Sequence, residues 1–250
     1  MTSTSDLAGK TTIVIGASRG LGRGIATALA EAGAPVVAVA RTAASLAELA
    51  DAGGVTPEVA DAADARVAAS LLDRYEPQAV ILVAGATPMI RPLQHQTWEA
   101  FSVNWHTDVR IAFHWLREAL LKPLRSDSKV IVISSGAALN GSPLSGGYAG
   151  AKATLRFITA YAQEEANRAS LNITFTAVLP RITPLTDLGR PAVQAYAARN
   201  HQTEQDYLKA FGDPLTPEIA GRALVELVRA DATTVAPAYL LTAAGLHELS

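Results

Sequence analysis

The sequence Thr11-Thr12-Ile13-Val14-Ile15-Gly16-Ala17-Ser18-Arg19-Gly20-Leu21-Gly22 passes from an apolar run to a turn that holds three glycines. The run predicts a buried parallel strand over 11–15, because strands buried on both faces read as continuous apolar segments. Residues 23–32 then predict a helix that ends at Gly33. A strand, a Gly-x-x-x-Gly-x-Gly turn and a helix N-terminus form a site for a dinucleotide pyrophosphate, since free backbone N–H groups face the ligand there.

The alternation of strand and helix continues along the rest of the chain. Further strands are predicted over 36–40, 55–60, 79–83, 130–133, 173–179 and 238–242. Helices are predicted over 43–52, 64–74, 97–121, about 147–169 and 216–230. Such alternation indicates βαβ units, so we expect an α/β fold with a Rossmann-like, doubly wound parallel sheet of about seven strands and helices on both faces. No linker interrupts the pattern, and residues 1–250 are expected to form one dinucleotide-binding domain.

One segment, 181–215, breaks the alternation. It contains prolines, glycines and a polar helix-like piece around 192–210. An excursion of this length inside a compact domain is usually a lid or a binding loop. We therefore expect 181–215 to be a substrate loop.

The composition argues against several classes of protein. Of the 250 residues, 49% are hydrophobic and 18% are charged, which is typical of a globular chain, and the net charge of −2 argues against a nucleic-acid partner. The five histidines show no metal-ligand spacing, so we expect no metal. Cysteine is absent and the segment Met1–Lys10 is short and polar, which favours a cytoplasmic protein without a membrane segment or signal peptide.

Three side chains with acid–base potential follow the fifth predicted strand. Tyr148 and Lys152 are four residues apart, so a helix places them on one face, where an ammonium favours ionisation of the phenol. Ser135 comes directly after the strand over 130–133, and its hydroxyl is expected in the crevice where open α/β sheets bind ligands. Separately, Tyr148 could belong to a core, Lys152 to a solvated surface, and Ser135 to a turn.

The end of the second predicted strand bears on the choice of dinucleotide. An acidic residue there would accept hydrogen bonds from the adenosine ribose of NAD, but this chain has Ala40-Arg41-Thr42. Arg41 and Arg19 could both approach a 2′-phosphate, because guanidinium groups suit phosphate oxygens. The alternative is that both are solvated surface residues. We expect NADP(H) to be preferred over NAD(H).

Together these residues resemble the short-chain dehydrogenase/reductase family, from Thr11 to about Gly245. The resemblance rests on motifs in the family's order. They are the glycine turn, Asp61 after the third strand, Ala84-Gly85 after the fourth, Asn104 in Phe-Ser-Val-Asn, Ser135 in Ile-Ser-Ser-Gly, and Tyr148-x-x-x-Lys152. It implies an NAD(P)-dependent oxidoreductase in which the cofactor carries out the redox chemistry and the protein orients it.

The resemblance also implies roles for individual residues. Tyr148 would protonate a carbonyl oxygen that Ser135 holds, Lys152 would bind the nicotinamide ribose, and Asn104 would hold a water that links Lys152 to solvent. Asp61 would accept a hydrogen bond from the adenine amine. The full set expected to bind the cofactor is Gly16, Ser18, Arg19, Gly20, Leu21, Gly22, Arg41, Thr42, Asp61, Ala84, Gly85, Tyr148, Lys152, Pro180, Ile182 and Thr183.

The chain departs from the family pattern at three places, one of which is Leu185 where the family usually has a threonine. Leu82-Val83-Ala84-Gly85 stands where the family usually has Asn-Asn-Ala-Gly, and Pro180-Arg181 stands where it usually has Pro-Gly. Arg181 could point away from the cofactor, or it could reach a phosphate or a substrate anion. The expected substrate pocket, with Met89, Ala137, Leu144 and Arg181 in its lining, is mostly apolar. It suits a hydrophobic carbonyl or alcohol better than a sugar.

Two other functions remain possible from the sequence. One is a non-catalytic NADP-binding sensor or regulator, which would not need Tyr148, Ser135 and Asn104 together. The other is a reductase of C=C bonds or a dehydratase, whose chemistry would not require Ser135 at the usual place. Fold analogy implies a homodimer or homotetramer, with the helices over 97–121 and 147–169 at the interface.

Overall fold

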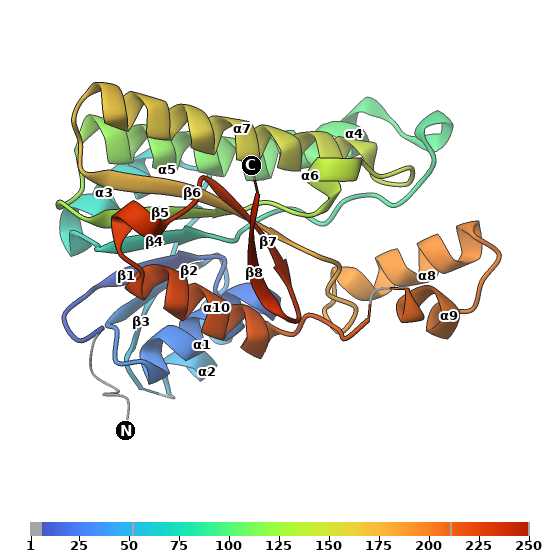
Figure 1. The fold of residues 1–250 in the computed structure, drawn as a ribbon, viewed down its shortest axis with the longest axis horizontal. Helices are drawn as coiled ribbons and strands as arrows, with labels where there is room; N and C mark the ends of the chain where they lie inside the picture. The colour runs from blue at the N-terminus through green and yellow to red at the C-terminus, as the bar shows by residue number, and fades with distance from the viewer. Residues whose placement is uncertain (1–6, 52, 211, 250) are drawn as a thin grey trace.

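The computed structural model describes residues 7–51, 53–210 and 212–249. Within them, eight strands form one sheet in the order β3-β2-β1-β4-β5-β6-β7-β8 (Figure 1). The strands are β1 (Thr12–Ile15), β2 (Val36–Ala40), β3 (Val55–Val59), β4 (Ala79–Leu82), β5 (Ser128–Ile133), β6 (Ile173–Pro180), β7 (Ala238–Thr242) and β8 (Gly245–Leu249). The first seven are parallel and β8 pairs antiparallel with β7, so the predicted doubly wound parallel sheet is confirmed.

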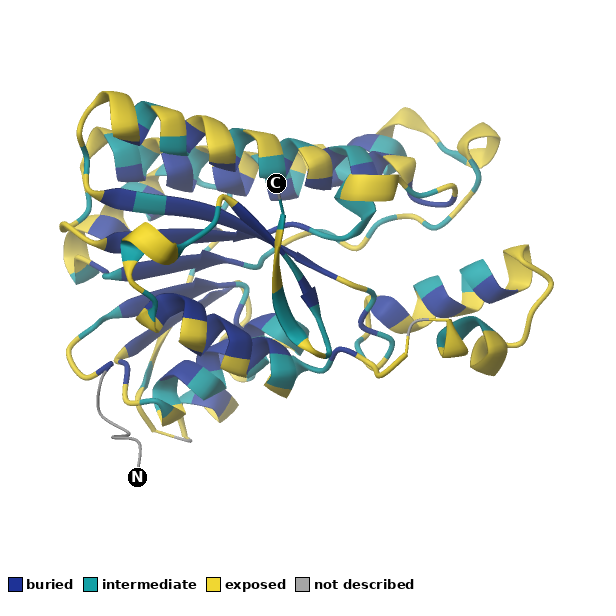
Figure 2. Cartoon of the chain, in the orientation of Figure 1, coloured by how far each residue is buried: buried dark blue, intermediate teal, exposed yellow. Residues whose placement is uncertain are grey.

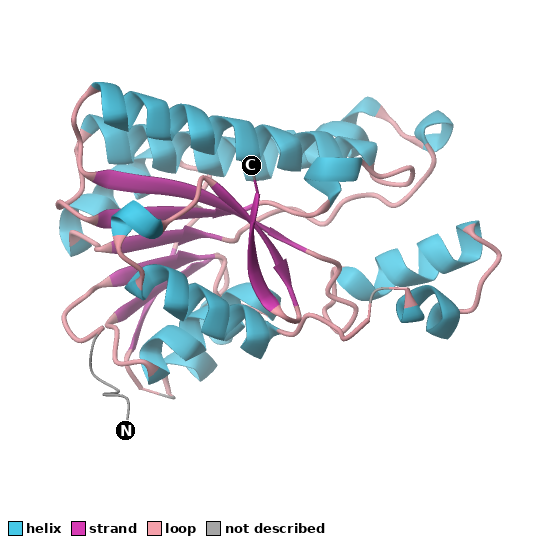
Figure 3. Ribbon diagram, in the orientation of Figure 1, coloured by secondary structure: helices cyan, strands magenta, loops and turns pink. Residues whose placement is uncertain are grey.

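Helices cover both faces of the sheet (Figures 1 and 3). They are α1 (Gly20–Glu31), α2 (Ala43–Ala50), α3 (Ala65–Tyr75), α4 (Trp98–Asn104), α5 (Arg110–Leu121), α6 (Ala137–Asn140), α7 (Gly146–Arg168), α8 (Gly189–Arg199), α9 (Glu204–Lys209) and α10 (Pro217–Arg229). Helices α1, α2 and α10 lie on one face, and α3, α5 and α7 lie on the other. Three short turns complete the list: η1 (Leu93–His95), η2 (Trp105–Val109) and η3 (Ala232–Thr234).

The two faces of β1 show why its residues form a central strand. Val14 packs into the core beneath α1 and α10, whereas Ile13 and Ile15 pack into the core beneath α3, α5 and α7. All three side chains are fully buried, as the dark blue strands of Figure 2 show for the centre of the sheet. A continuous β-branched run can fill both cores because successive strand residues point to opposite faces.

The strand order reverses beside β1 and so creates the crevice. The chain moves outward from β1 through β2 to β3 and then returns to place β4 on the other side of β1. Ile15 of β1 pairs in register with Val39 of β2 and with Leu82 of β4, so these strands end at the same level. Ligands of open α/β sheets bind at such a switch point, outside the carboxyl ends of the strands.

The structure differs from the predicted elements in three places. The sequence predicted about seven strands, and β8 was missed because its residues alternate poorly and lie half-exposed at the sheet edge. The helix expected over 97–121 is interrupted by the π-helical turn η2. The piece expected around 192–210 is two helices, since Thr203 caps a new helix through a hydrogen bond from the N–H of Asp206.

Two expectations extend beyond the described residues. The helix predicted to reach Ala52 ends at Ala50, and Ala52 itself lies outside them. Residues 1–6 of the polar N-terminal segment also lie outside. Within the part of the chain that the structure covers, none of the helices is long and apolar enough to cross a membrane.

Candidate active site

A cavity of about 730 Å³ opens at the carboxyl ends of β1, β4, β5 and β6, a volume within the range of small-molecule sites. It extends from the glycine turn after β1 to the N-terminal part of α7. The sequence-predicted residues that line it are Gly16, Ser18, Arg19, Gly20, Leu21, Gly22, Arg41, Asp61, Ala84, Gly85, Ser135, Ala137, Tyr148, Lys152, Pro180, Arg181, Ile182 and Thr183. The fold thus brings together, in one cavity, predicted residues that lie up to 167 positions apart in the chain, from Gly16 to Thr183.

Four predicted residues are not in that lining. Met89 is 42% exposed, and Leu144 is buried with its carbonyl accepting a hydrogen bond from the N–H of Arg91. Neither side chain therefore lines the cavity. Thr42 precedes α2 outside the lining, and Asn104 lies in a second layer behind Asp108.

The glycine turn is shaped by close packing. A Cβ atom on Gly22 would lie 2.0 Å from the carbonyl oxygen of Gly16, and one on Gly16 would lie 2.6 Å from the backbone nitrogen of Ala84. Gly16 also has a φ of +92°, which side chains rarely tolerate. Because α1 begins at Gly20 and Arg19 makes no side-chain capping bond, the first N–H groups of this helix face the cavity.

Two arginines lie at the end of the cavity near β2. Arg41 follows β2 directly, and no acidic residue accompanies it on the lining at that strand end. Arg19 pairs with Asp187 of the segment 181–215 at 3.8 Å, and both side chains are largely exposed. Asp61 also lines the cavity, where its Oδ1 accepts the N–H of Ala63 at 3.0 Å.

Ser135, Tyr148 and Lys152 meet at the other end. The Nζ of Lys152 lies 5.5 Å from the centre of the Tyr148 ring. The hydroxyl of Ser135 accepts a hydrogen bond from the N–H of Ala137 at 3.2 Å, which leaves its proton available to the cavity. Ser134 holds the two elements together, because its hydroxyl donates to the carbonyl oxygen of Lys152 at 2.6 Å. The expected juxtaposition of phenol, ammonium and hydroxyl is therefore present.

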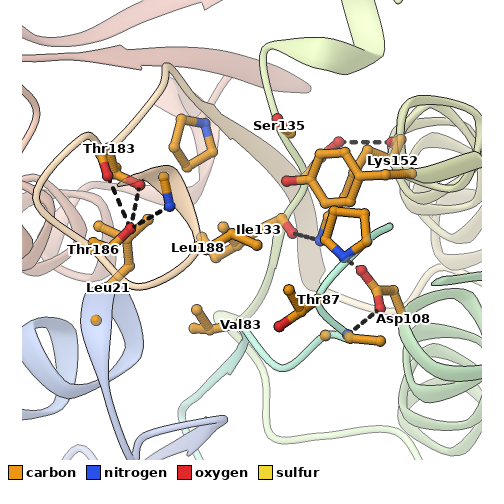
Figure 4. Close-up of a pocket in the computed structure, with 18 of the residues that line it drawn as sticks. Leu21, Val83, Thr87, Asp108, Ile133, Ser135, Lys152, Thr183, Thr186 and Leu188 are labelled. Atoms are coloured by element: carbon orange, nitrogen blue, oxygen red, sulfur yellow. Dashed lines mark hydrogen bonds and ion pairs between the residues drawn. The ribbon is translucent and has the colours of Figure 1, made fainter. Parts of the chain in front are cut away.

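Lys152 has a partner that the sequence analysis missed. Its Nζ lies 3.1 Å from Oδ2 of Asp108 and donates to the carbonyl oxygen of Ile133 at 3.3 Å (Figure 4). Burial is the strongest single influence on the Lys152 ammonium and would lower its pKa, but the charge and hydrogen bond of Asp108 and the charge of Tyr148 together outweigh burial, so the pKa is raised above its ordinary value. Asp108 stands four residues after Asn104, and this spacing within a helical region is the signal that could have found it.

Asn104 contributes to the same cluster from α4. Its Nδ2 donates to the carbonyl oxygen of Ala86 at 2.7 Å and lies 3.3 Å from Oδ1 of Asp108. Its buried Oδ1 has no hydrogen-bond partner among the described residues. The amide therefore braces the loop after β4 and keeps one acceptor free.

Aromatic rings from the segment 181–215 line the cavity beyond Ser135. Tyr196 of α8 and Tyr207 of α9 stack with centroids 6.0 Å apart and planes at 9°. The hydroxyl of Tyr196 forms a hydrogen bond with the hydroxyl of Ser142, so the loop is joined to the segment before α7. Other apolar lining residues here are Ile90, Leu139, Pro143, Leu188 and Ala192. Tyr207 was not predicted, because the sequence pattern did not separate α8 from α9.

The sequence of this chain is similar to those of known dehydrogenases and reductases. A family model described as short chain dehydrogenase matches residues 10–197. The L-xylulose reductase of Mesocricetus auratus is 35% identical over 105 residues, which cover 42% of this chain and 43% of that protein. The match thus spans less than half of the reductase.

Two further relatives match over longer stretches. The hydroxynaphthalene reductase-like protein Arp2 of Metarhizium majus is 30% identical over 188 residues, covering 70% of this chain and 68% of that protein. A structure described as an NAD(P) dependent gluconate 5-dehydrogenase of Beutenbergia cavernae, with NADP bound at low occupancy, superimposes with a TM-score of 0.78. It is 26% identical and covers 96% of each chain.

Proposed function

The chain belongs to the short-chain dehydrogenase/reductase family of NAD(P)-dependent enzymes, and on that premise we propose that it transfers hydride between NADP(H) and a hydrophobic carbonyl or alcohol. Tyr148 is the general acid–base of this proposal. The observation that carries it is the common cavity, in which Ser135, Tyr148 and Lys152 lie at one end and the glycine turn at the other.

The residues of the cavity fit a dinucleotide. The turn is packed too closely at Gly16 and Gly22 for either residue to carry a side chain, and a pyrophosphate can approach the free N–H groups at the start of α1. Lys152 would bind the nicotinamide ribose with the ammonium proton that neither Asp108 nor Ile133 takes. Ile182 and Thr183 line the same cavity after β6, and their backbone groups would meet the nicotinamide carboxamide.

The chemistry of the chain's own groups is a proton transfer. The bound nicotinamide supplies or accepts the hydride. The Tyr148 hydroxyl donates its proton to the substrate oxygen during reduction, while Ser135 donates a hydrogen bond to the same oxygen and holds it in reach. In the reverse direction Tyr148 accepts the proton. The free Oδ1 of Asn104 fits the role of accepting from a water that returns protons toward Lys152.

The preference for NADP(H) rests on Arg41 and Arg19. Arg41 follows β2 at the place where an acid would select NAD, and Arg19 lies in the glycine turn on the same cavity. Two guanidinium groups provide charge-assisted hydrogen bonds to a 2′-phosphate. We therefore expect the protein to bind NADPH more tightly than NADH.

Replacing Asp187 with asparagine is expected to strengthen NADPH binding by about two- to threefold. The gain is small because exposed ion pairs are weak. Asp187 partly neutralises Arg19 at 3.8 Å, so its loss leaves the guanidinium to a phosphate. Fluorescence titration with NADPH and NADH measures the change. The gain should vanish at high salt and should be absent for NADH; an equal gain for both cofactors contradicts a role for Arg19 at the 2′-phosphate.

The substrate end supports a hydrophobic carbonyl compound rather than a sugar. The stacked Tyr196 and Tyr207 and the surrounding aliphatic side chains offer few hydrogen bonds, whereas a sugar needs many. Arg181 also lies on this lining, together with the polar residues Thr87, Asn140 and Asp187, and it would favour a substrate that carries an acid group. Steady-state oxidation of NADPH with acetophenone, its 4-carboxyl derivative and an aliphatic ketone tests both points. Absence of turnover with every ketone, despite NADPH binding, would favour the non-catalytic sensor.

A homo-oligomer is also part of the proposal. The outer surface of α4, η2, α5 and α7 exposes large apolar side chains, which monomers rarely cluster. They are Trp98, Trp105, Phe113, Leu121, Phe157 and Tyr161. We expect a dimer or tetramer in size-exclusion chromatography with light scattering. Phe157→Asp, which places a charge on this face, should shift the protein to the monomer; an unchanged mass would exclude this surface as the interface.

A further inference from the structure

The buried carboxylate of Asp108 has no part in the proton transfer described so far. It lies in η2, between α4 and α5, and its side chain is 1% exposed. A charged group in such a position is costly unless it is paired. The groups that pair with Asp108 therefore indicate why a carboxylate is buried at this position.

Asp108 joins three elements that line the cavity. Its Oδ1 accepts the N–H of Ala86 at 2.8 Å in the loop after β4, and its Oδ2 pairs with Lys152 of α7 at 3.1 Å. The loop packs against the carboxylate so closely that a Cβ atom on Gly85 would lie 2.6 Å from Oδ2. The Asp108 carboxylate thus occupies the space that a side chain at position 85 would need. It links the backbone of the loop after β4 to α7.

The two fixed partners of the Lys152 ammonium determine where its third N–H donor points. An ammonium has three donors, and here Asp108 and the carbonyl oxygen of Ile133 take two of them. The third donor is left for the cavity beside Tyr148. Removing one of the two fixed partners lets the ammonium rotate and swing on its flexible stem, so the direction of the third donor is lost.

We propose that Asp108 is a positioning residue that fixes the Lys152 ammonium, and that its charge acts on cofactor binding and turnover only through Lys152, whereas its contact with the N–H of Ala86 needs only an oxygen acceptor. The inference rests on the proposed function, because it assigns Lys152 to the nicotinamide ribose. Asp108 also balances the charge of Lys152, so the pair adds no net charge beneath the reacting groups.

A cycle of four proteins tests the proposal: the unaltered chain, Asp108→Asn, Lys152→Met and the double variant. Asp108→Asn keeps the shape of the side chain but removes its charge. We expect it to lower kcat at least about tenfold in the unaltered background and to change it less than about twofold when Lys152 is already methionine. Turnover is measured with NADPH and acetophenone, and is expressed per NADPH-binding site. A purely structural role of Asp108 would give equal losses in both backgrounds and would overturn the proposal.

The same cycle is measured on the dissociation constant of NADPH, so it is complete even if Lys152→Met shows no turnover. Asp108→Asn should weaken NADPH binding severalfold only where Lys152 is present. Asp231→Asn is the matched control, because this exposed carboxylate also accepts a backbone N–H, that of Thr233, but lies outside the cavity lining. It should leave both quantities unchanged.

Urea unfolding of the four proteins separates the inference from the proposed function, since it needs neither substrate nor cofactor. Lys152→Met leaves the Asp108 carboxylate unpaired, and adding Asp108→Asn should restore part of the lost stability. If Asp108→Asn alone does not fold, recovery in the double variant still supports the pairing. Additive losses would overturn it. If the unaltered chain binds NADPH but reduces no ketone, the proposed function fails while the stability and affinity cycles still decide the role of Asp108.

Discussion

Tyr148→Phe is expected to lower kcat by about 10²–10⁴-fold, the usual contribution of a general acid–base. The phenol is the proton donor to the substrate oxygen, and phenylalanine keeps the ring beside Lys152 while removing that proton. Because the ring does not hold the adenosine half of the cofactor, the dissociation constant of NADPH should change by less than about threefold. Steady-state kinetics and fluorescence titration on the same preparation measure the two effects.

Tyr161→Phe provides the matched control for this variant. Tyr161 lies on the same helix, α7, but its side chain is 55% exposed on the outer face of the molecule. It should retain full turnover. Substantial activity in Tyr148→Phe would remove the phenol from the mechanism, whereas loss of both turnover and NADPH binding would indicate a damaged fold instead.

Arg41→Asp is expected to weaken NADPH binding by about 100-fold, since a charge-assisted contact is worth about 1.5–3 kcal/mol and the new carboxylate repels the 2′-phosphate. NADH lacks this phosphate, and the introduced acid can accept from its ribose hydroxyls, so its affinity should hold or improve. The preference between the two cofactors should therefore fall or reverse. Titration of both cofactors into both proteins measures it.

The control for the charge change is Arg168→Asp at the last residue of α7. This arginine is 75% exposed and pairs with Glu165 away from the cavity lining. It alters the net charge equally and should change neither affinity by more than about twofold. If the unaltered protein prefers NADH, or if Arg41→Asp affects both cofactors alike, the assignment of Arg41 to the 2′-phosphate is wrong.

The fold could be predicted in most of its parts because its strands are buried on both faces. The runs 36–40 and 238–242 coincide with β2 and β7, since continuous apolar segments bounded by glycine or proline leave few other structures. Strand β8 has no such run. Gly245–Leu249 lies at the edge of the sheet, where one side of the strand meets solvent and the apolar pattern that marks the others is absent.

The site was predictable where spacing along one element determines geometry. Tyr148 and Lys152 share a helix, so a separation of four residues places them together. Asp108 was not predicted because its role depends on the interruption of a helix. The sequence predicts one continuous helix over 97–121, and in such a helix Asp108, near His106 and Arg110, resembles a solvated surface residue. In the structure η2 separates α4 from α5, and the Asp108 side chain is buried.

Two of the residues expected at the substrate lie outside the cavity lining, for a related reason. Met89 and Leu144 were chosen by their distance from the predicted strand ends, and that distance does not determine which way a loop residue points. Tyr207 reaches the cavity because α8 and α9 fold back on each other and stack it on Tyr196. Such a contact between two short helices has no local sequence signal.

Transfer of deuterium from (4-²H)NADPH to a ketone tests the central claim most directly. The purified protein is incubated with acetophenone or its 4-carboxyl derivative and with NADPH deuterated at the transferred position, and the alcohol is analysed by mass spectrometry. We predict that one deuterium appears on the carbinol carbon with the unaltered protein and that the product is nearly absent with Tyr148→Phe. Bound NADPH without any deuterated alcohol, or equal product from both proteins, would contradict a Tyr148-dependent hydride transfer.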